Sequence, residues 1–70
     1  MDAAWQALVD EALTAATDEP LRRDALRERL RRREGYTMEY VFWTQTKDDR
    51  RARRMLRRMI DEITGERLWP

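Results

Sequence analysis

The hydrophobic positions near the start of the chain repeat with the period of an α-helix. Between residues 3 and 16 they fall at positions i, i+3, i+4, i+7, i+8 and i+11, which makes one continuous apolar stripe. The stripe consists of Trp5, Leu8, Val9, Ala12, Leu13 and Ala16. Asp2 precedes it, and its carboxylate can accept a hydrogen bond from a free amide of the first turn. The pattern predicts a first helix over residues 3–16, with Asp2 as its N-cap.

Pro20 predicts the start of a second helix, because the missing amide of proline would have no helical partner at the first position. This helix is expected to run to about Glu34 and to stop at Gly35, which can adopt a left-handed conformation. Its apolar residues are few, and most of the others are arginine. The second helix therefore has only a narrow apolar face that can be buried in a core.

The segment from residue 36 to residue 46 allows two interpretations. Its aromatic and β-branched residues have strong strand propensity, but a lone strand in a 70-residue chain has no obvious partner. Thr37 as N-cap, with Tyr36 and Val41 spaced as a hydrophobic staple, favours a short helix over residues 38–45. The alternative is a strand at residues 36–45 that pairs across a dimer.

The last helix is predicted from about Lys47 to Thr64, after a capping signal formed by Thr46 and Asp49 and before a stop at Gly65. Its apolar residues fall within an arc of roughly 140°, namely Ala52, Met55, Leu56, Met59, Ile60 and Ile63. Its arginines fill a separate arc of roughly 160°, namely Arg50, Arg51, Arg53, Arg54, Arg57 and Arg58. One side of this helix should face a core and the other side should face water.

These elements predict one small all-α domain over residues 1–70, with four helices of which the third is short. The order of the last three helices is that of a helix-turn-helix unit, with the last helix in the recognition position. In such a unit Thr44, Gln45, Thr46 and Lys47 would approach a phosphate or a base edge. Arg50, Arg51 and Arg54 would follow into the groove.

The amino-acid composition excludes most catalytic chemistry. The sequence has no Cys, His, Ser or Asn, so it lacks thiol and serine nucleophiles, imidazole bases and the usual transition-metal ligands. Its two glycines occupy helix-stop positions, which leaves no phosphate-binding loop. Adjacent carboxylates such as Asp48 and Asp49 point about 100° apart on a helix and cannot form a facing catalytic pair. We therefore expect no enzyme activity, no metal and no cofactor.

Charge is strongly segregated along the chain, although the net charge is only +1. Residues 1–19 carry acids and no bases, whereas residues 20–34 and 47–64 are rich in arginine; of all 15 basic residues, only Lys47 is a lysine. Guanidinium groups bind phosphate oxygens in pairs and reach guanine edges, so the arginine arc favours a nucleic acid, above all double-stranded DNA. The candidate binding residues are Gln45, Thr46, Lys47, Arg50, Arg51, Arg53, Arg54, Arg57 and Arg58. We expect a small DNA-binding regulator or accessory protein of the phage or mobile-element kind.

Each of these features also has a plainer explanation. The arginine arc has the composition of an ordinary helix face that is exposed to water. The run from Arg31 to Arg33 can be explained by the favourable interaction of cations with the dipole at the C-terminal end of the second helix. The aromatic residues could stack unpaired bases, but a thin core needs them. The alternative function is a protein–protein interaction module, an adaptor or inhibitor that docks an acidic partner through its charged helices.

The size of the chain points to association with another chain. Folding is expected to hide only about 60% of the surface of a chain of this size, and no disulfide or zinc site is available to reinforce it. A homodimer or a partner-stabilised domain is therefore expected. The first sixteen residues do not resemble a secretory signal, and no apolar run approaches the roughly 20 residues of a membrane span. We expect a soluble cytoplasmic protein without a membrane partner.

Overall fold

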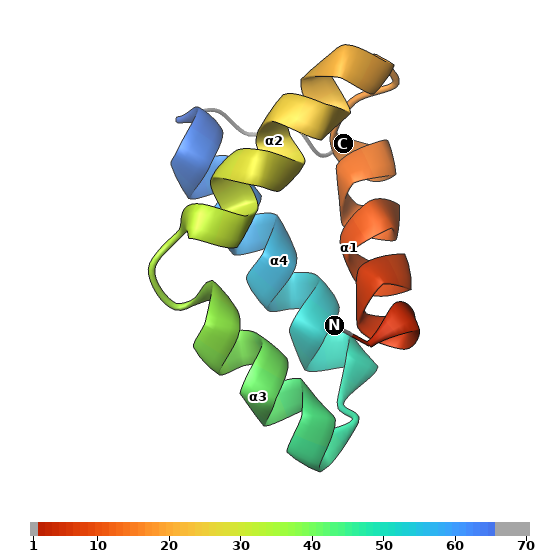
Figure 1. The fold of residues 1–70 in the computed structure, drawn as a ribbon, viewed down its shortest axis with the longest axis vertical. Coiled ribbons are helices and arrows are strands. Elements are labelled where there is room, and N and C mark those ends of the chain that lie inside the picture. Colours follow the sequence, from red (N-terminus) through yellow and green to blue (C-terminus); the bar gives the residue numbers. More distant parts are fainter. Residues whose placement is uncertain (1, 66–70) are drawn as a thin grey trace.

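The computed structural model describes residues 2–65, which form four helices joined by short turns (Figure 1). The helices are α1 (Ala3–Ala16), α2 (Pro20–Arg32), α3 (Tyr36–Thr46) and α4 (Asp49–Thr64). No strand occurs in this part of the chain, and α3 is the shortest helix. The all-α fold with a short third helix is confirmed, and the alternative of an aromatic strand at residues 36–45 is wrong.

The predicted bounds of α1, the start of α2 and the end of α4 are confirmed. The Asp2 carboxylate accepts a hydrogen bond from the amide of Ala4 at 2.7 Å and caps α1. Gly65 adopts a left-handed conformation, with φ of 71°, and closes α4. Pro20 is the first residue of α2, as its missing amide predicts.

The connection between α2 and α3 differs from the prediction. The second helix ends at Arg32, with Arg33 as its C-cap, and Gly35 is the N-cap of α3 rather than the stop of α2. Gly35 has φ of 92°, a left-handed conformation that suits glycine and turns the chain directly into the next helix. As a result α3 begins at Tyr36 instead of residue 38, and Thr37 lies inside the helix and is not its cap.

The connection between α3 and α4 also differs from the prediction, which placed the end of the third helix at residue 45 and the start of the last helix at about Lys47. Lys47 has φ of 53° and ends α3, so the chain reverses at this residue. The N-cap of α4 is Asp48, whose carboxylate accepts from the amide of Arg51 at 3.0 Å. Thr46 belongs to α3, because its hydroxyl donates back to the carbonyl of Phe42. The predicted capping role of Thr46 is wrong, since Asp48 stands nearer to the first free amides of α4.

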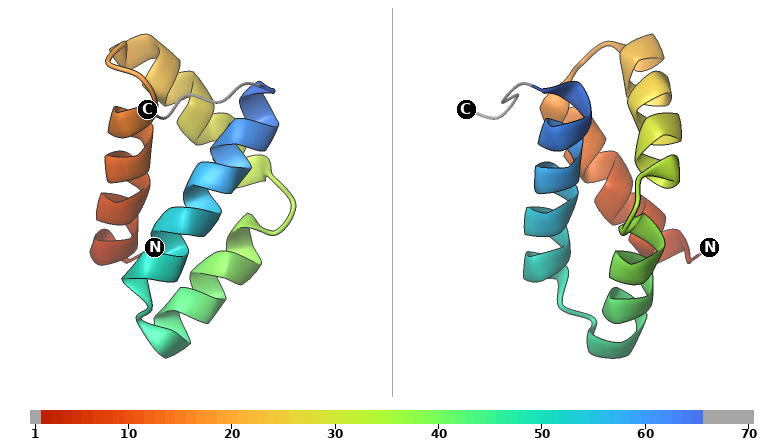
Figure 2. Two further views of the ribbon diagram at one scale, coloured as in Figure 1. Left: turned by 180° about the vertical axis from the view of Figure 1, so that it is seen from behind. Right: turned by 90° about the vertical axis from the view of Figure 1, so that its left-hand side faces the viewer.

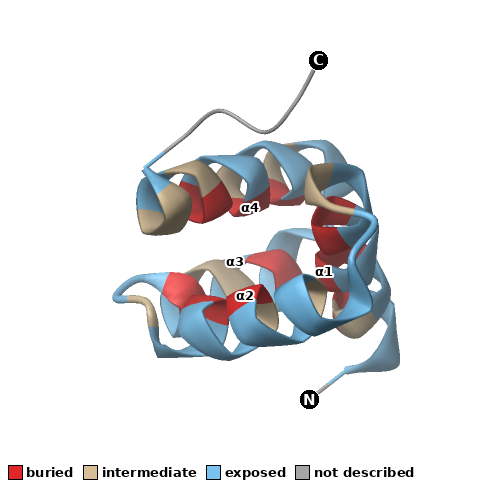
Figure 3. Ribbon diagram, turned by 90° about the horizontal axis from the view of Figure 1, so that it is seen from above, coloured by how far each residue is buried: buried red, intermediate tan, exposed pale blue. Residues whose placement is uncertain are grey.

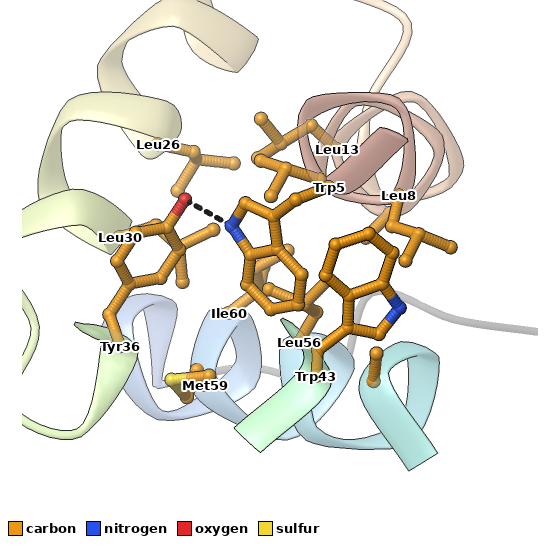
Figure 4. Packing of buried hydrophobic residues seen from close by; sticks show 13 residues of the cluster. Trp5, Leu8, Leu13, Leu26, Leu30, Tyr36, Trp43, Leu56, Met59 and Ile60 are labelled. Carbon is orange, nitrogen blue, oxygen red and sulfur yellow. Dashed lines mark hydrogen bonds between the residues drawn. The ribbon is translucent and has the colours of Figure 1, made fainter. Parts of the chain in front are cut away.

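The core is centred on Trp5, which is fully buried (Figure 4). The Trp5 ring packs against the rings of Tyr36, Tyr40 and Trp43, with centroids 5.6 to 5.9 Å apart. The indole N–H of Trp5 donates a hydrogen bond of 3.0 Å to the hydroxyl of Tyr36. The thin helix α2 adds only Leu26 and Leu30 to the buried set. The aromatic residues of α3 thus supply core volume that α2 does not.

Helix α4 packs against each of the other three helices, and the buried residues face inward between them (Figure 3). Helices α3 and α4 lie side by side and run in opposite directions (Figures 1 and 2). The helix order of the predicted helix-turn-helix unit is present. The antiparallel packing of α3 and α4, however, differs from the steep crossing of that motif in DNA-binding proteins.

Within residues 2–65, no helix has the length and apolar character that crossing a membrane requires.

Candidate nucleic-acid interface on the last helix

Helix α4 has the two separate faces that its sequence predicts. Its core side is formed by Ala52, Leu56, Met59 and Ile60, which are buried, and by Met55 and Ile63, which are half-buried. The arginines lie outside the core, and all of them except the half-buried Arg51 are exposed. The structure therefore brings the six candidate arginines of this helix onto one surface.

Two of these arginines are bound by neighbouring helices. Arg51 forms a forked ion pair with Glu39 of α3, and its guanidinium lies 4.0 Å from the centre of the Phe42 ring. Arg53 donates from Nε to Glu11 of α1 at 2.8 Å. The hydrogen bond to Glu11, followed by the attraction of its charge, raises the pKa of Arg53. The two edges of the arginine arc are thus attached to α3 and α1.

The remaining four arginines, Arg50, Arg54, Arg57 and Arg58, form an outer arginine row along the exposed side of α4. They help to line a shallow, open depression, to which Asp61 and Glu62 contribute carboxylates. Arg58 donates to Glu62 at 3.1 Å, whereas Arg50 and Arg54 form no ion pair with any residue that the structure describes. At a rise of about 1.5 Å per residue, the row from residue 50 to residue 58 is about 12 Å long.

The row contains like charges at helical neighbour positions. Arg50 and Arg54, and Arg54 and Arg58, are four residues apart, and such pairs cost about 0.2–0.5 kcal/mol each when nothing screens them. An anion bound across the row would remove this repulsion. The outer arginine row is therefore suited to a ligand that carries several negative charges.

Two of the candidate DNA-binding residues just before α4 already make contacts within the protein. The Thr46 hydroxyl donates to Phe42 and accepts from the amide of Asp48, and the ammonium of Lys47 lies 4.0 Å from the centre of the Trp43 ring. Gln45 is exposed beside them. The structure thus groups Gln45, Thr46 and Lys47 at the corner between α3 and α4, apart from most of the arginines.

Two carboxylates occupy the positive end of α4, where a phosphate would otherwise be favoured. Asp48 caps the helix, and Asp49 accepts a hydrogen bond of 2.7 Å from the indole N–H of Trp43. Negative side chains are favourable in the first turn, but they also repel a second anion. The sequence contains this signal as two adjacent aspartates; the cap formed by Asp48 and the hydrogen bond from Trp43 to Asp49 become visible only in the structure.

The arginines near the end of α2 bind mostly within the protein. Arg31 and Arg32 form ion pairs with Glu28 on the same helix, and Arg33 pairs with Glu62 of α4. Arg29 donates to the carbonyl of Ile63 near the end of α4 at 2.6 Å. The contacts of Arg29 and Arg33 attach α2 to α4, whereas those of Arg31 and Arg32 stay within α2.

The acids of α1 are likewise paired. Asp10 accepts from Arg27 of α2 at 2.8 Å, and Arg27 also binds Asp24. The hydrogen bond to Asp10 is the largest cause that raises the pKa of Arg27. Because Glu11 binds Arg53, both central acids of α1 neutralise arginines of neighbouring helices. The sequence shows the charge segregation but not these pairings.

No three carboxylates lie close enough to hold a metal ion within the described part of the chain. Comparison with protein-family models, curated proteins and solved structures finds no match to this chain. The ligand of the arginine face has to be inferred from the chemistry of the face itself.

Proposed function

We propose that this protein binds nucleic acid, in the first place double-stranded DNA, as a small regulator or accessory factor. The observation that carries the proposal is the outer arginine row, in which Arg50 and Arg54 form no ion pair with any described residue. Guanidinium groups form paired, charge-assisted hydrogen bonds with phosphate oxygens, and a row of them matches a polyanion.

The length and position of the row support contact with a duplex. The row is about 12 Å long, and the major groove is about 12 Å wide and admits an α-helix. Arginines on the exposed side of α4 can then reach the phosphates that border the groove. Because Asp48 and Asp49 repel phosphate at the amides of the helix end, the contacts are expected along the outer arginine row and not at the N-terminus itself.

This geometry supports binding to the DNA backbone more than readout of the base sequence. Of the predicted residues at the corner, Thr46 already uses its hydroxyl inside the protein and Lys47 lies over Trp43. Backbone contacts alone give dissociation constants of about 10⁻⁴ to 10⁻⁶ M at physiological salt. We expect an affinity in this range, with little dependence on sequence.

Fluorescence anisotropy with a labelled duplex over a series of salt concentrations tests the proposal. If the four arginines of the row each contact a phosphate, log K should fall with log salt with a slope of about −3.6. The double variant Arg50→Gln/Arg54→Gln removes two contacts and should make the slope shallower by about 1.8. Glutamine keeps good helix propensity, so α4 should remain folded.

The matched control is Arg31→Gln/Arg32→Gln, which changes the net charge by the same amount on α2. Its arginines pair with Glu28 and are not part of the outer arginine row, so its slope should change less than that of Arg50→Gln/Arg54→Gln. An equal change of slope in the two double variants would show that binding depends only on the net charge of the protein. Absence of wild-type binding at low salt would contradict the proposal.

The second candidate function is a protein-interaction module that binds an acidic partner. The outer arginine row suits carboxylates as well as phosphates, but docking through α1 has less support because Asp10 and Glu11 are already paired. A labelled poly-glutamate peptide, titrated under the same conditions as the duplex, separates the two candidates. Tighter binding of the peptide than of a duplex with the same number of charges would favour the protein partner.

A further inference from the structure

Glu62 lies at the end of the outer arginine row and binds an arginine of each of two helices. Arg50, Arg54 and Arg58 are four residues apart, and Glu62 follows Arg58 by another four, so the carboxylate continues the same line along α4. Its Oε1 accepts a hydrogen bond of 3.1 Å from Nε of Arg58, and its Oε2 accepts one from Arg33 of α2. Glu62 thus connects the outer arginine row to the end of α2.

The two guanidinium groups around Glu62 are arranged in a way that also suits a phosphate of the DNA backbone. Each carboxylate oxygen accepts from a different arginine. A backbone phosphate has one negative charge on two oxygens that are not part of the chain linkage, and guanidinium groups bind such oxygens strongly. A phosphate in place of the carboxylate can therefore accept from Arg33 and from Arg58.

The carboxylate of Glu62 is open to exchange with an anion from solution. The side chains of Glu62 and Arg33 are 40% and 34% exposed, and ion pairs with this much exposure contribute little to stability. Glu62 borders both the depression along the outer arginine row and a second open depression at the end of α2. In addition, the buried Nε of Arg33 has no hydrogen-bond acceptor among residues 2–65, so Glu62 satisfies this guanidinium only in part.

The charges of the neighbouring helices favour α2 as the element on which a polyanion continues beyond α4. Residues 1–19, which include α1, carry five acids and no bases, and the only charged residue of α3 is Glu39. Residues 20–34, which include α2, carry seven arginines and three acids. Of the three helices that pack against α4, only α2 adds positive charge to that of the outer arginine row.

We propose that Arg33 and Arg58 form a phosphate-binding site at the junction of α2 and α4, from which a DNA phosphate displaces Glu62. The inference rests on the proposed function, because the phosphate belongs to the duplex that the outer arginine row binds. It extends the DNA interface from one helix to two. Glu62 holds both guanidinium groups in the free protein and competes with the phosphate for them, so this carboxylate limits the affinity for DNA.

Fluorescence anisotropy with the same labelled duplex, at one low salt concentration, tests the site through two variants with opposite expected effects. Glu62→Gln removes the competing carboxylate and should bind the duplex about tenfold more tightly than the wild type. Arg33→Gln removes one charge-assisted hydrogen bond to the phosphate and should bind about tenfold more weakly. If the pair only attached α2 to α4, both variants would loosen the same contact and would change binding in the same direction.

Two control variants make the same changes of charge at another ion pair of α2. Glu28 also binds two arginines, Arg31 and Arg32, and Glu28→Gln raises the net charge as Glu62→Gln does. Arg31→Gln lowers the net charge as Arg33→Gln does. Both controls should change the affinity much less than the junction variants. Circular dichroism of all four variants shows whether the helices remain formed.

A measurement on the wild type tests the displacement without any substitution. When the duplex is added to saturation, the carboxylate ¹³C NMR signal of Glu62 should shift, because this group loses both of its guanidinium partners. The carboxylate signal of Glu28 should stay in place. An unchanged Glu62 signal with the duplex bound overturns the phosphate site.

The affinities also separate the failure of this inference from the failure of the proposed function. A wild type that binds no duplex at low salt overturns both. If the wild type binds through Arg50 and Arg54 but Glu62→Gln and Arg33→Gln behave like their controls, the interface on α4 stands and the phosphate site at the junction is overturned.

Discussion

At the scale of single residues, the hydrogen bond between Trp5 and Tyr36 explains how two polar groups lie in a core that is otherwise apolar. Both side chains are buried, and the indole N–H donates to the tyrosine hydroxyl. The residues are 31 positions apart in the sequence, so no local pattern pairs them. Their contact requires α3 to begin at Tyr36, which depends on the left-handed conformation of Gly35.

The variant Tyr36→Phe should destabilise the protein, because it leaves the buried indole N–H of Trp5 without its acceptor. An unsatisfied buried donor costs about 1–3 kcal/mol, and in a domain of this size each kcal/mol lowers Tm by about 4–8 °C. Thermal unfolding followed by circular dichroism measures this change. The control Tyr40→Phe removes a hydroxyl from a half-buried ring that also packs against Trp5, and it should lower Tm much less. Equal shifts in the two variants would contradict the role of the hydrogen bond.

At the scale of helices, the periodicity of apolar residues predicts the existence and the facing of α1 and α4. Each of these helices has a long stripe that can be buried in only one way. The boundaries around α3 are harder to predict, since several residues compete to cap the same ends. Thr46 and Asp48 both offer an oxygen to the start of α4, and the choice depends on Lys47, a non-glycine residue in a left-handed conformation.

The variant Asp48→Ala should destabilise α4 by about 0.5–2 kcal/mol, because the amide of Arg51 loses its side-chain acceptor. Asp48→Asn keeps an acceptor oxygen in place and should recover most of this loss, with a small deficit from the missing charge at the helix dipole. Chemical denaturation of both variants measures the difference. A deficit in Asp48→Asn as large as in Asp48→Ala would show that charge and not capping stabilises this end.

At the scale of the whole molecule, the arginine arc is predictable but the availability of each arginine is not. Helical periodicity places all six arginines of α4 away from the core. Which of them remain open to a ligand depends on acids from other helices: Glu39 binds Arg51, and Glu11 binds Arg53 from 42 positions away. These pairings follow from the packing of α1 and α3 against α4, which the pattern of a single helix does not encode.

The raised pKa values of Arg27 and Arg53 do not make the stability of the fold depend on pH near neutrality. A cation whose pKa is raised by folding contributes stability that is fully present below its unfolded pKa and is lost only as the pH rises through its folded pKa. Arginine pKa values lie far above neutral pH. The effect of these ion pairs on ligand binding can therefore be measured at neutral pH with both guanidinium groups charged.

The ion pair between Glu11 and Arg53 provides a test of whether DNA binds on the exposed side of α4. Both side chains are about half exposed, so Glu11→Gln should change stability little, but it releases Arg53 beside the outer arginine row. If the row binds DNA phosphates, the released arginine adds about one contact, and the slope of log K against log salt should steepen by about 0.9. Asp10→Asn makes the same change in net charge, but its partner Arg27 remains paired with Asp24 on α2, so its slope should stay close to that of the wild type. Equal steepening in the two variants would mean that the total charge governs binding, whereas an effect of Glu11→Gln alone would locate binding on the exposed side of α4.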